Sequence, residues 1–163
     1  MELFQIRTNF VASTTIKMLK SKKPEQSLEF ILNNTARILN TAISRTFVKN
    51  GFDVTVEQWT ILNILWEKDG RCQYELAEAS EKERPGITRI IDNMEKNNLV
   101  VRVPSENDKR HKLIFLTYKA KELKEKLNDI ANITVLKAAK SISKDELNNF
   151  KEINLKIQSN LAE

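Results

Sequence analysis

The residues of this chain that are equipped for binding chemistry are basic and amide side chains, gathered in two short stretches. Arginine can donate two hydrogen bonds to guanine, asparagine pairs with adenine, and threonine suits a phosphate or a methyl group. Both stretches are therefore candidates for contact with nucleic acid, although the first taken alone is better explained as a solvated helix face, and the basic-tipped hairpin after it is what favours DNA contact. The first holds Arg84, Gly86, Thr88, Arg89 and Asn93, and the second holds Asp108, Lys109, Arg110 and His111.

The chain lacks the residues that a metal site, a phosphate-binding loop or a catalytic site would need. The chain has one histidine and one cysteine, so no ordinary metal cluster of these residues can be assembled. It has no glycine-rich phosphate loop, and its acidic residues are scattered along expected helix surfaces. We expect no enzyme activity, no metal and no cofactor. The net charge of +5 permits a polyanionic partner only where the basic residues are placed together.

A helix starting near Pro85 is expected to carry the first stretch. Proline suits the first turn of a helix because the N–H that it lacks has no partner there. If the apolar residues face the core, the 100° step per residue points Arg89, Asp92 and Lys96 outward, with Thr88 and Asn93 beside them. Asp92 would repel phosphate, so we expect the half from Arg84 to Arg89 to enter a DNA groove most deeply. The expected core face is Ile87, Ile90, Ile91 and Met94.

Two further helices and a hairpin are expected to position this helix. Thr55 and Gln58 form a capping-box pair that opens a helix with Trp59 and Trp66 on its apolar face, where core packing is a better explanation than a ligand cage. A short helix follows, roughly 74–79. The runs 99–103 and 112–116 predict a two-stranded hairpin around the polar loop 104–111.

Helices are also expected at both ends of this centre, because only three Gly and three Pro interrupt the chain. One spans about 28–50; Thr117 caps a long helix; Ser143 and Glu146 form a capping box before the last. Apolar stripes on the first and last helices predict a homodimer. The candidates for its interface are Leu28, Phe30, Leu147, Phe150, Ile153 and Ile157.

Residues 1–27 have poor periodicity, so we expect a loosely attached extension, with Met18 as an alternative start. No apolar run approaches the roughly 18–20 residues that cross a bilayer, and no signal peptide is recognisable. The lone Cys72 excludes an internal disulfide and fits a reducing compartment. These features favour a cytoplasmic protein without a membrane partner.

Several motifs stand in a distinctive order and spacing along the chain: Thr55-(2)-Gln58, Glu75-Leu76-Ala77, Ile87-Thr88-Arg89-Ile90-Ile91-Asp92, Met94-Glu95, Leu99-Val100, Asp108-Lys109-Arg110 and Leu116-Thr117. Their order and spacing resemble those of MarR-family regulators. The resemblance covers roughly 28–160, and the Asp-x-Arg of the hairpin followed by Leu-Thr is its most specific part. It implies a dimer joined by its terminal helices, binding to palindromic duplex DNA, and control by a small aromatic or phenolic effector or by oxidation.

The chain departs from this pattern at three places. Asn98 stands where the family usually has glycine, although asparagine also adopts the left-handed conformation. Cys72 replaces the usual Thr or Ser at a helix N-cap, where backbone N–H groups would favour its thiolate, although an unpaired structural cysteine is the more common explanation. The first long helix has no cysteine, which counts against the oxidation-sensing mechanism of some family members.

The sequence therefore predicts a mainly α fold with a small β-hairpin, namely a winged helix-turn-helix over about 54–116 flanked by dimerisation helices at about 28–50 and 117–161. The expected function is transcription regulation, as a repressor, through Arg84, Gly86, Thr88, Arg89 and Asn93 in the major groove and Lys109, Arg110 and His111 at the wing, with Asp108 orienting Arg110. The residues of an effector site are not predicted. The alternative is a winged-helix module that binds protein and has lost DNA binding.

Overall fold

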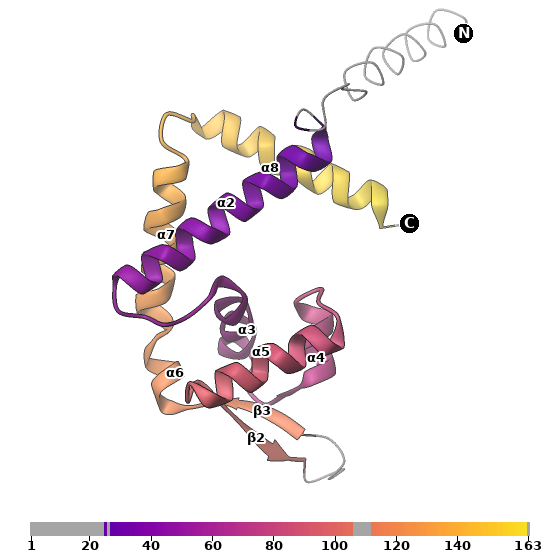
Figure 1. Cartoon of the computed structure of the whole chain (residues 1–163). Helices are drawn as coiled ribbons and strands as arrows, with labels where there is room; N and C mark the ends of the chain where they lie inside the picture. Colours follow the sequence, from indigo (N-terminus) through magenta and orange to yellow (C-terminus); the bar gives the residue numbers. More distant parts are fainter. Residues whose placement is uncertain (1–24, 26, 106–111, 163) are drawn as a thin grey trace, which may run out of the picture. The chain divides into compact units, whose positions relative to one another are not determined.

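The computed structural model describes residues 25, 27–105 and 112–162 of the 163-residue chain. The chain forms two compact units, 1–41 and 42–163, whose boundary falls inside the first described helix. None of the described helices is long and apolar enough to cross a membrane. The elements, shown in Figure 1, are α2 (Leu28–Lys49), α3 (Val56–Glu67), β1 (Arg71–Cys72), α4 (Gln73–Ala79), α5 (Arg84–Lys96), β2 (Val100–Pro104), β3 (Lys112–Leu116), α6 (Tyr118–Glu122), α7 (Lys124–Ala138) and α8 (Lys144–Leu161).

The core of the second unit lies where α3, α4 and α5 meet the small sheet. Each element contributes apolar side chains from one face, and burial of this shared apolar surface holds the three helices and the sheet together. The predicted mainly helical architecture with a winged helix-turn-helix is confirmed. The fully buried side chains at this centre include Ile61, Leu62, Leu65, Leu76, Ile87, Ile91, Met94, Leu99 and Ile114.

Two predicted capping boxes are present. The Thr55 hydroxyl accepts the N–H of Gln58 at 3.2 Å, and the Gln58 amide oxygen accepts the N–H of Thr55 at 3.0 Å. Ser143 and Glu146 make the same exchange at the start of α8. Each pair satisfies two backbone N–H groups that a helix N-terminus leaves without partners. These starts were predictable because their hydrogen bonds are local in sequence.

The sheet has three strands where the sequence predicted two. The predicted hairpin, β2 and β3, is joined by β1, in the antiparallel order β1-β3-β2 with Arg71 opposite Ile114. A two-residue strand has no periodicity to detect, so β1 was missed. Gly70, at φ +72°, turns the chain into β1, and a Cβ there would stand 2.6 Å from the ring of Phe115.

The single long helix predicted after Thr117 is two helices. Thr117 caps α6 as expected, its hydroxyl accepting the N–H of Ala120 at 3.1 Å. At Leu123 the backbone N–H bonds to the carbonyl of Ala120, three residues back, and this tighter turn separates α6 from α7. The apolar spacing runs through the break, so the pattern alone does not reveal it.

The two tryptophans serve packing, as predicted. The indole N–H of Trp59 donates to the Asn128 side chain at 3.0 Å, and that of Trp66 donates to the carbonyl of Ala120 at 3.0 Å. The ring of Trp59 also meets that of Phe47 edge-on, with centroids 6.0 Å apart. Both indoles thus connect α3 to the helices that follow the sheet.

Candidate nucleic-acid interface

The α5 helix turns a polar face to solvent. Its core face holds Ile87, Ile91 and Met94, all fully buried, while Ile90, predicted for the same face, is only half-buried. Because these residues fix the rotation of the helix, Arg89 and Asn93 are exposed on the opposite side, as the sequence analysis expected. These exposed side chains offer the donors and acceptors that read base edges.

The first turn of α5 leaves backbone open to a ligand. Arg84 is the first residue of the helix and Pro85 the second, and both are exposed. Gly86 is also exposed, and a Cβ added there would meet no atom within 4 Å. A helix N-terminus carries unpaired N–H groups and a partial positive charge, so an anion can approach this turn closely.

A hollow of about 530 Å³ lies beside this turn, between the start of α3 and the outer face of α5. At its edge the ammonium of Lys82 and the carboxylate of Glu57 form an ion pair at 2.9 Å. The hollow connects the outer face of α5 to the N-terminus of α3. It is lined by Thr55, Glu57, Gln58, Lys82, Glu83, Gly86, Arg89, Ile90 and Asn93.

Thr88 is exposed, yet its hydroxyl already has partners within the protein. It donates to the carbonyl of Arg84 at 3.1 Å and accepts from the side-chain amide of Gln73 at 3.1 Å. The methyl group stays available for an apolar contact, whereas a hydroxyl contact with phosphate would have to share an occupied group.

Asp92 is not the isolated negative charge that the sequence suggested. Its carboxylate pairs with the guanidinium of Arg102 at 2.6 Å, and the carboxylate of Glu95 pairs with the same guanidinium. Arg102 lies on β2, and sequence reasoning missed it, because the pairing depends on how the strand returns along α5. The spacing of 10 and 7 residues gives no local signal.

The wing residues Asp108, Lys109, Arg110 and His111 lie outside the described residues. Their predicted roles therefore remain predictions. The strands that lead to them, β2 and β3, are paired from Val100 opposite Leu116 to Pro104 opposite Lys112.

Cys72 is the N-cap of α4, as predicted, but its thiolate is not favoured. Its backbone N–H donates to the Glu75 carboxylate at 2.7 Å. Burial of the thiol raises its pKa, and the nearby negative charge of Glu75 raises it further. The expected stabilisation of the thiolate by the helix N-terminus is therefore outweighed.

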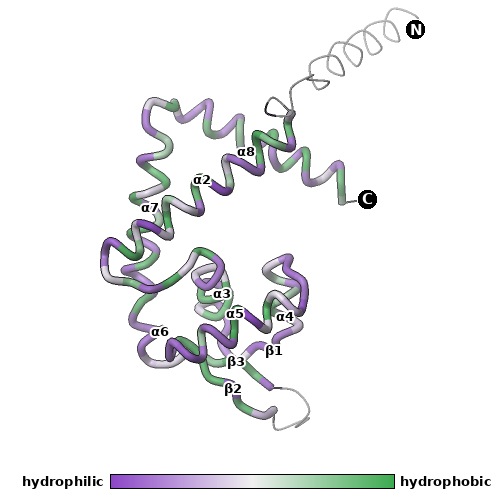
Figure 2. Tube along the Cα trace, in the orientation of Figure 1, coloured by the Kyte–Doolittle hydropathy of each residue, from purple (hydrophilic) through white to green (hydrophobic). Residues whose placement is uncertain are grey.

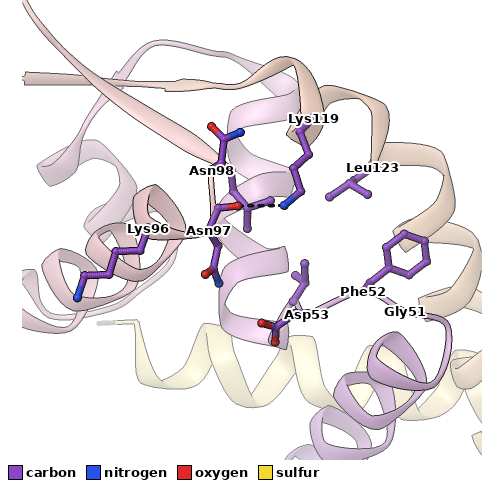
Figure 3. Close-up of a pocket in the computed structure, with 10 residues that line it drawn as sticks. Gly51, Phe52, Asp53, Lys96, Asn97, Asn98, Lys119 and Leu123 are labelled. Carbon is purple, nitrogen blue, oxygen red and sulfur yellow. Dashed lines mark hydrogen bonds between the residues drawn. The ribbon is translucent and has the colours of Figure 1, made fainter.

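A second hollow, of about 330 Å³, lies at the other end of α5 (Figure 3). There the ammonium of Lys119 donates to the carbonyl of Asn97 at 3.0 Å. Asn98 adopts the left-handed conformation, φ +55°, that the sequence analysis expected of it. The lining residues are Gly51, Phe52, Asp53, Val54, Lys96, Asn97, Asn98, Leu99, Lys119 and Leu123.

Comparison with solved structures gives similar folds among transcription regulators. The MepR–DNA complex from S. aureus is 23% identical, with a TM-score of 0.74 over 83% of this chain and 98% of that chain. The transcriptional repressor CouR bound to a 23-mer DNA duplex is 20% identical, with a TM-score of 0.74 over 85% of this chain and 99% of that chain. CouR from Rhodococcus jostii RHA1 bound to p-coumaroyl-CoA is 20% identical, with a TM-score of 0.68 over 84% and 95%.

The family model of MarR proteins matches residues 54–112, from the end of the loop before α3 to the start of β3. This range contains α3, α4, α5 and β2, the elements that present the exposed face of α5. Residues 54–112 thus match the MarR family model, and the chain shares the winged helix-turn-helix fold of these solved structures.

Proposed function

We propose that this protein is a transcription regulator that binds duplex DNA with α5 in the major groove. The observation that carries the proposal is the exposed polar face of α5, with Arg89 and Asn93 outward and an accessible backbone at Gly86. A helix held in this way by a helix-turn-helix fits the major groove, where arginine and asparagine distinguish base pairs. Its neighbours MepR and CouR have both been solved with DNA.

A gel shift with the DNA upstream of the protein's own gene tests this function. We expect a discrete complex that survives an excess of unrelated duplex at physiological salt, since sequence-specific binding exceeds non-specific binding by about 10³-fold or more. The proposal is contradicted if the unrelated duplex competes as well as the upstream DNA does, or if the protein does not bind DNA at all. The competing function, a winged-helix module for protein partners, predicts that the protein does not bind DNA.

We propose that the regulator is a homodimer on a palindromic operator, with residues 28–50 and 117–161 forming the dimerisation helices. Support comes from α8, which has no buried residue although Figure 2 shows hydrophobic and hydrophilic residues alternating along it. Phe150 and Ile153 are exposed by 54% and 47%, and Leu28 and Phe30 by 42% and 46%. Leu147 and Ile157 are half-buried.

Light scattering at micromolar concentration measures the assembly directly. A dimer gives twice the 18.9 kDa mass of one chain, and a species at the mass of one chain contradicts the proposal. Phe150→Asp should produce the single-chain mass, because a carboxylate buried in an apolar interface without a partner is costly. Lys151→Asp, on the exposed neighbouring position of α8, is the matched control that leaves the dimer intact.

We propose further that the protein is a cytoplasmic repressor, and that a small aromatic or phenolic compound releases it from DNA. The solved complex of CouR with p-coumaroyl-CoA supports the class of effector. We propose the hollow in Figure 3, at the C-terminal end of α5, as the candidate site for such a compound, because binding there would change the angle of that helix. Coupling between two such sites is typically about 1–3 kcal/mol.

A titration of aromatic acids, phenols and an aromatic acyl-CoA thioester tests this release. At least one compound should raise both the melting temperature and the Kd for DNA, by up to about a hundredfold. If none of them changes either quantity, the effector proposal fails while DNA binding stands.

A further inference from the structure

Arg102 is the centre of a hydrogen-bonded cluster that joins the strand β2 to the helices α4 and α5. One terminal nitrogen of its guanidinium donates to Asp92 at 2.6 Å and the other to Glu95. Its backbone N–H also donates to Glu95, at 3.3 Å. The strand is thereby fastened to the outer face of α5 at two carboxylates.

Gln73 extends the cluster to α4. Its amide oxygen accepts from Nε of Arg102 at 3.4 Å, and its amide nitrogen donates to the hydroxyl of Thr88 at 3.1 Å. A single side chain therefore connects Arg102 with the exposed face of α5. All three nitrogens of the guanidinium have partners inside the protein.

This arrangement argues against a direct contact between Arg102 and DNA. The side chain is 13% exposed, whereas those of Asp92 and Glu95 are 50% and 41% exposed. A phosphate would have to displace two carboxylates, each of which accepts a charge-assisted hydrogen bond from one terminal nitrogen of the guanidinium, and such bonds are among the stronger ones in proteins. The groups that DNA would meet here are the carboxylates.

The positive charge of Arg102 offsets part of the negative charge of Asp92 and Glu95. Asp92 and Glu95 lie on the helix that would enter the groove, and two unpaired carboxylates there would repel the phosphates on either side. Pairing with one guanidinium leaves the cluster with one net negative charge in place of two. The same pairing holds β2 beside α5.

We propose that Arg102 is a positioning residue for DNA recognition, which masks the carboxylates of Asp92 and Glu95 and fixes β2 to α5 without contacting DNA itself. This inference rests on the proposed function. It makes a prediction opposite to that for a phosphate-contacting arginine, because removing the two carboxylates should compensate for the loss of Arg102.

The test measures DNA affinity by fluorescence anisotropy for four proteins: wild type, Arg102→Met, the triple variant Arg102→Met/Asp92→Asn/Glu95→Gln, and a control. The control, Arg102→Met/Glu122→Gln/Glu125→Gln, has the same net charge as the triple variant, with its neutralised residues on α6 and α7. Melting temperatures check the fold, and Arg102→Gln, which also removes the positive charge, replaces Arg102→Met throughout the series if the latter does not fold.

We expect Arg102→Met to weaken binding about tenfold or more. The triple variant should recover most of that loss, and the control much less. Recovery in neither variant, with a slope of log affinity against log salt reduced by about 1, would mean that Arg102 contacts a phosphate and would overturn the inference. Equal recovery in both variants, or an unchanged Arg102→Met, overturns it too. A wild-type protein that does not bind DNA overturns the proposed function instead.

Discussion

At the scale of single residues, the proposed reading of DNA depends on side chains that are exposed and form no hydrogen bond within the described residues. Arg89 and Asn93 are exposed because Ile87, Ile91 and Met94 hold the opposite side of α5 in the core. Thr88, on the same helix, has a hydroxyl that is already bonded to Arg84 and Gln73. The main share of base recognition is therefore expected from Arg89.

Replacing Arg89 by Ala should weaken specific DNA binding by about 1–3 kcal/mol, the discrimination that a bidentate contact with guanine provides. The preference for one base position should relax as well. Affinities for a set of single-base operator variants measure both effects. Arg45→Ala, an exposed arginine on α2, is the matched control and should keep the preference. Unchanged preference in Arg89→Ala would assign this residue to the solvated surface.

Cys72 should ionise only at a higher pH than an ordinary thiol, because burial and Glu75 raise the pKa of its thiol. A raised pKa means that, at a pH near the pKa, a smaller fraction of the thiol is ionised than in an ordinary cysteine. The midpoint of alkylation rate against pH should therefore lie higher in the folded protein than in the protein unfolded in urea. Glu75→Gln should bring the folded midpoint down. A folded midpoint below the unfolded one would restore the reactive-thiolate interpretation.

The sequence revealed residues whose roles are set by their own helix and missed those set by contacts between elements. Helical spacing was enough to put Arg89 and Asn93 on the outer face of α5. It was not enough to show that Asp92 is paired, since its partner Arg102 belongs to a strand placed by the fold. The raised pKa of the Cys72 thiol was not predictable for the same reason, because burial depends on tertiary packing.

At the scale of elements, two glycines are needed for different reasons, one for the fold and the other for the proposed interface. Gly70 leads into β1 at φ +72°, with the ring of Phe115 where a Cβ would stand, whereas the space around Gly86 in α5 is open. Gly70 is needed by the fold, and Gly86 is free to serve the interface.

Substitution of each glycine by alanine should distinguish a role in stability from a role in DNA binding. Gly70→Ala should lower the melting temperature, since positive φ and the contact with Phe115 both oppose a side chain. Gly86→Ala should keep or raise stability, by up to about 1 kcal/mol, because alanine is the better helix former. It should nevertheless weaken DNA binding if phosphate approaches this turn. Thermal unfolding monitored by circular dichroism decides the first part, and a destabilised Gly86→Ala would contradict it.

The wing is expected to contact the minor groove through Arg110, with Asp108 restricting its rotamers, as their spacing in the sequence suggests. Arg110→Ala should weaken binding to many sequences and reduce its salt dependence. Asp108→Ala should also weaken binding, although less, despite raising the net positive charge. Measured affinities give the sign. Tighter binding by Asp108→Ala would show that the wing acts through charge alone.

Among the elements, those with local signals were predicted and those without were not. The capping boxes at Thr55 and Ser143 predicted the starts of two helices, and the strand-forming runs 99–103 and 112–116 predicted the hairpin. Strand β1 was not predicted because its pairing with β3 does not affect the spacing of apolar residues. The helix break at Leu123 was not predicted because the tightened turn there does not interrupt that spacing either.

At the scale of the whole molecule, the proposed function requires two copies of α5 at a fixed separation. A dimeric helix-turn-helix protein places its reading helices one turn of DNA apart, about 10 bp. The exposed apolar residues of α8 offer the surface for such pairing. Half-site spacing thus tests the reading helix and the dimer together.

Hydroxyl-radical footprinting of the protein on the DNA upstream of its own gene makes that test. The account predicts two protected half-sites, related by symmetry and centred about 10 bp apart, whose protection is lost with Arg89→Ala at the same protein concentration. Uniform protection of any sequence, or protection that Arg89→Ala leaves unchanged, would contradict the claim that α5 reads DNA.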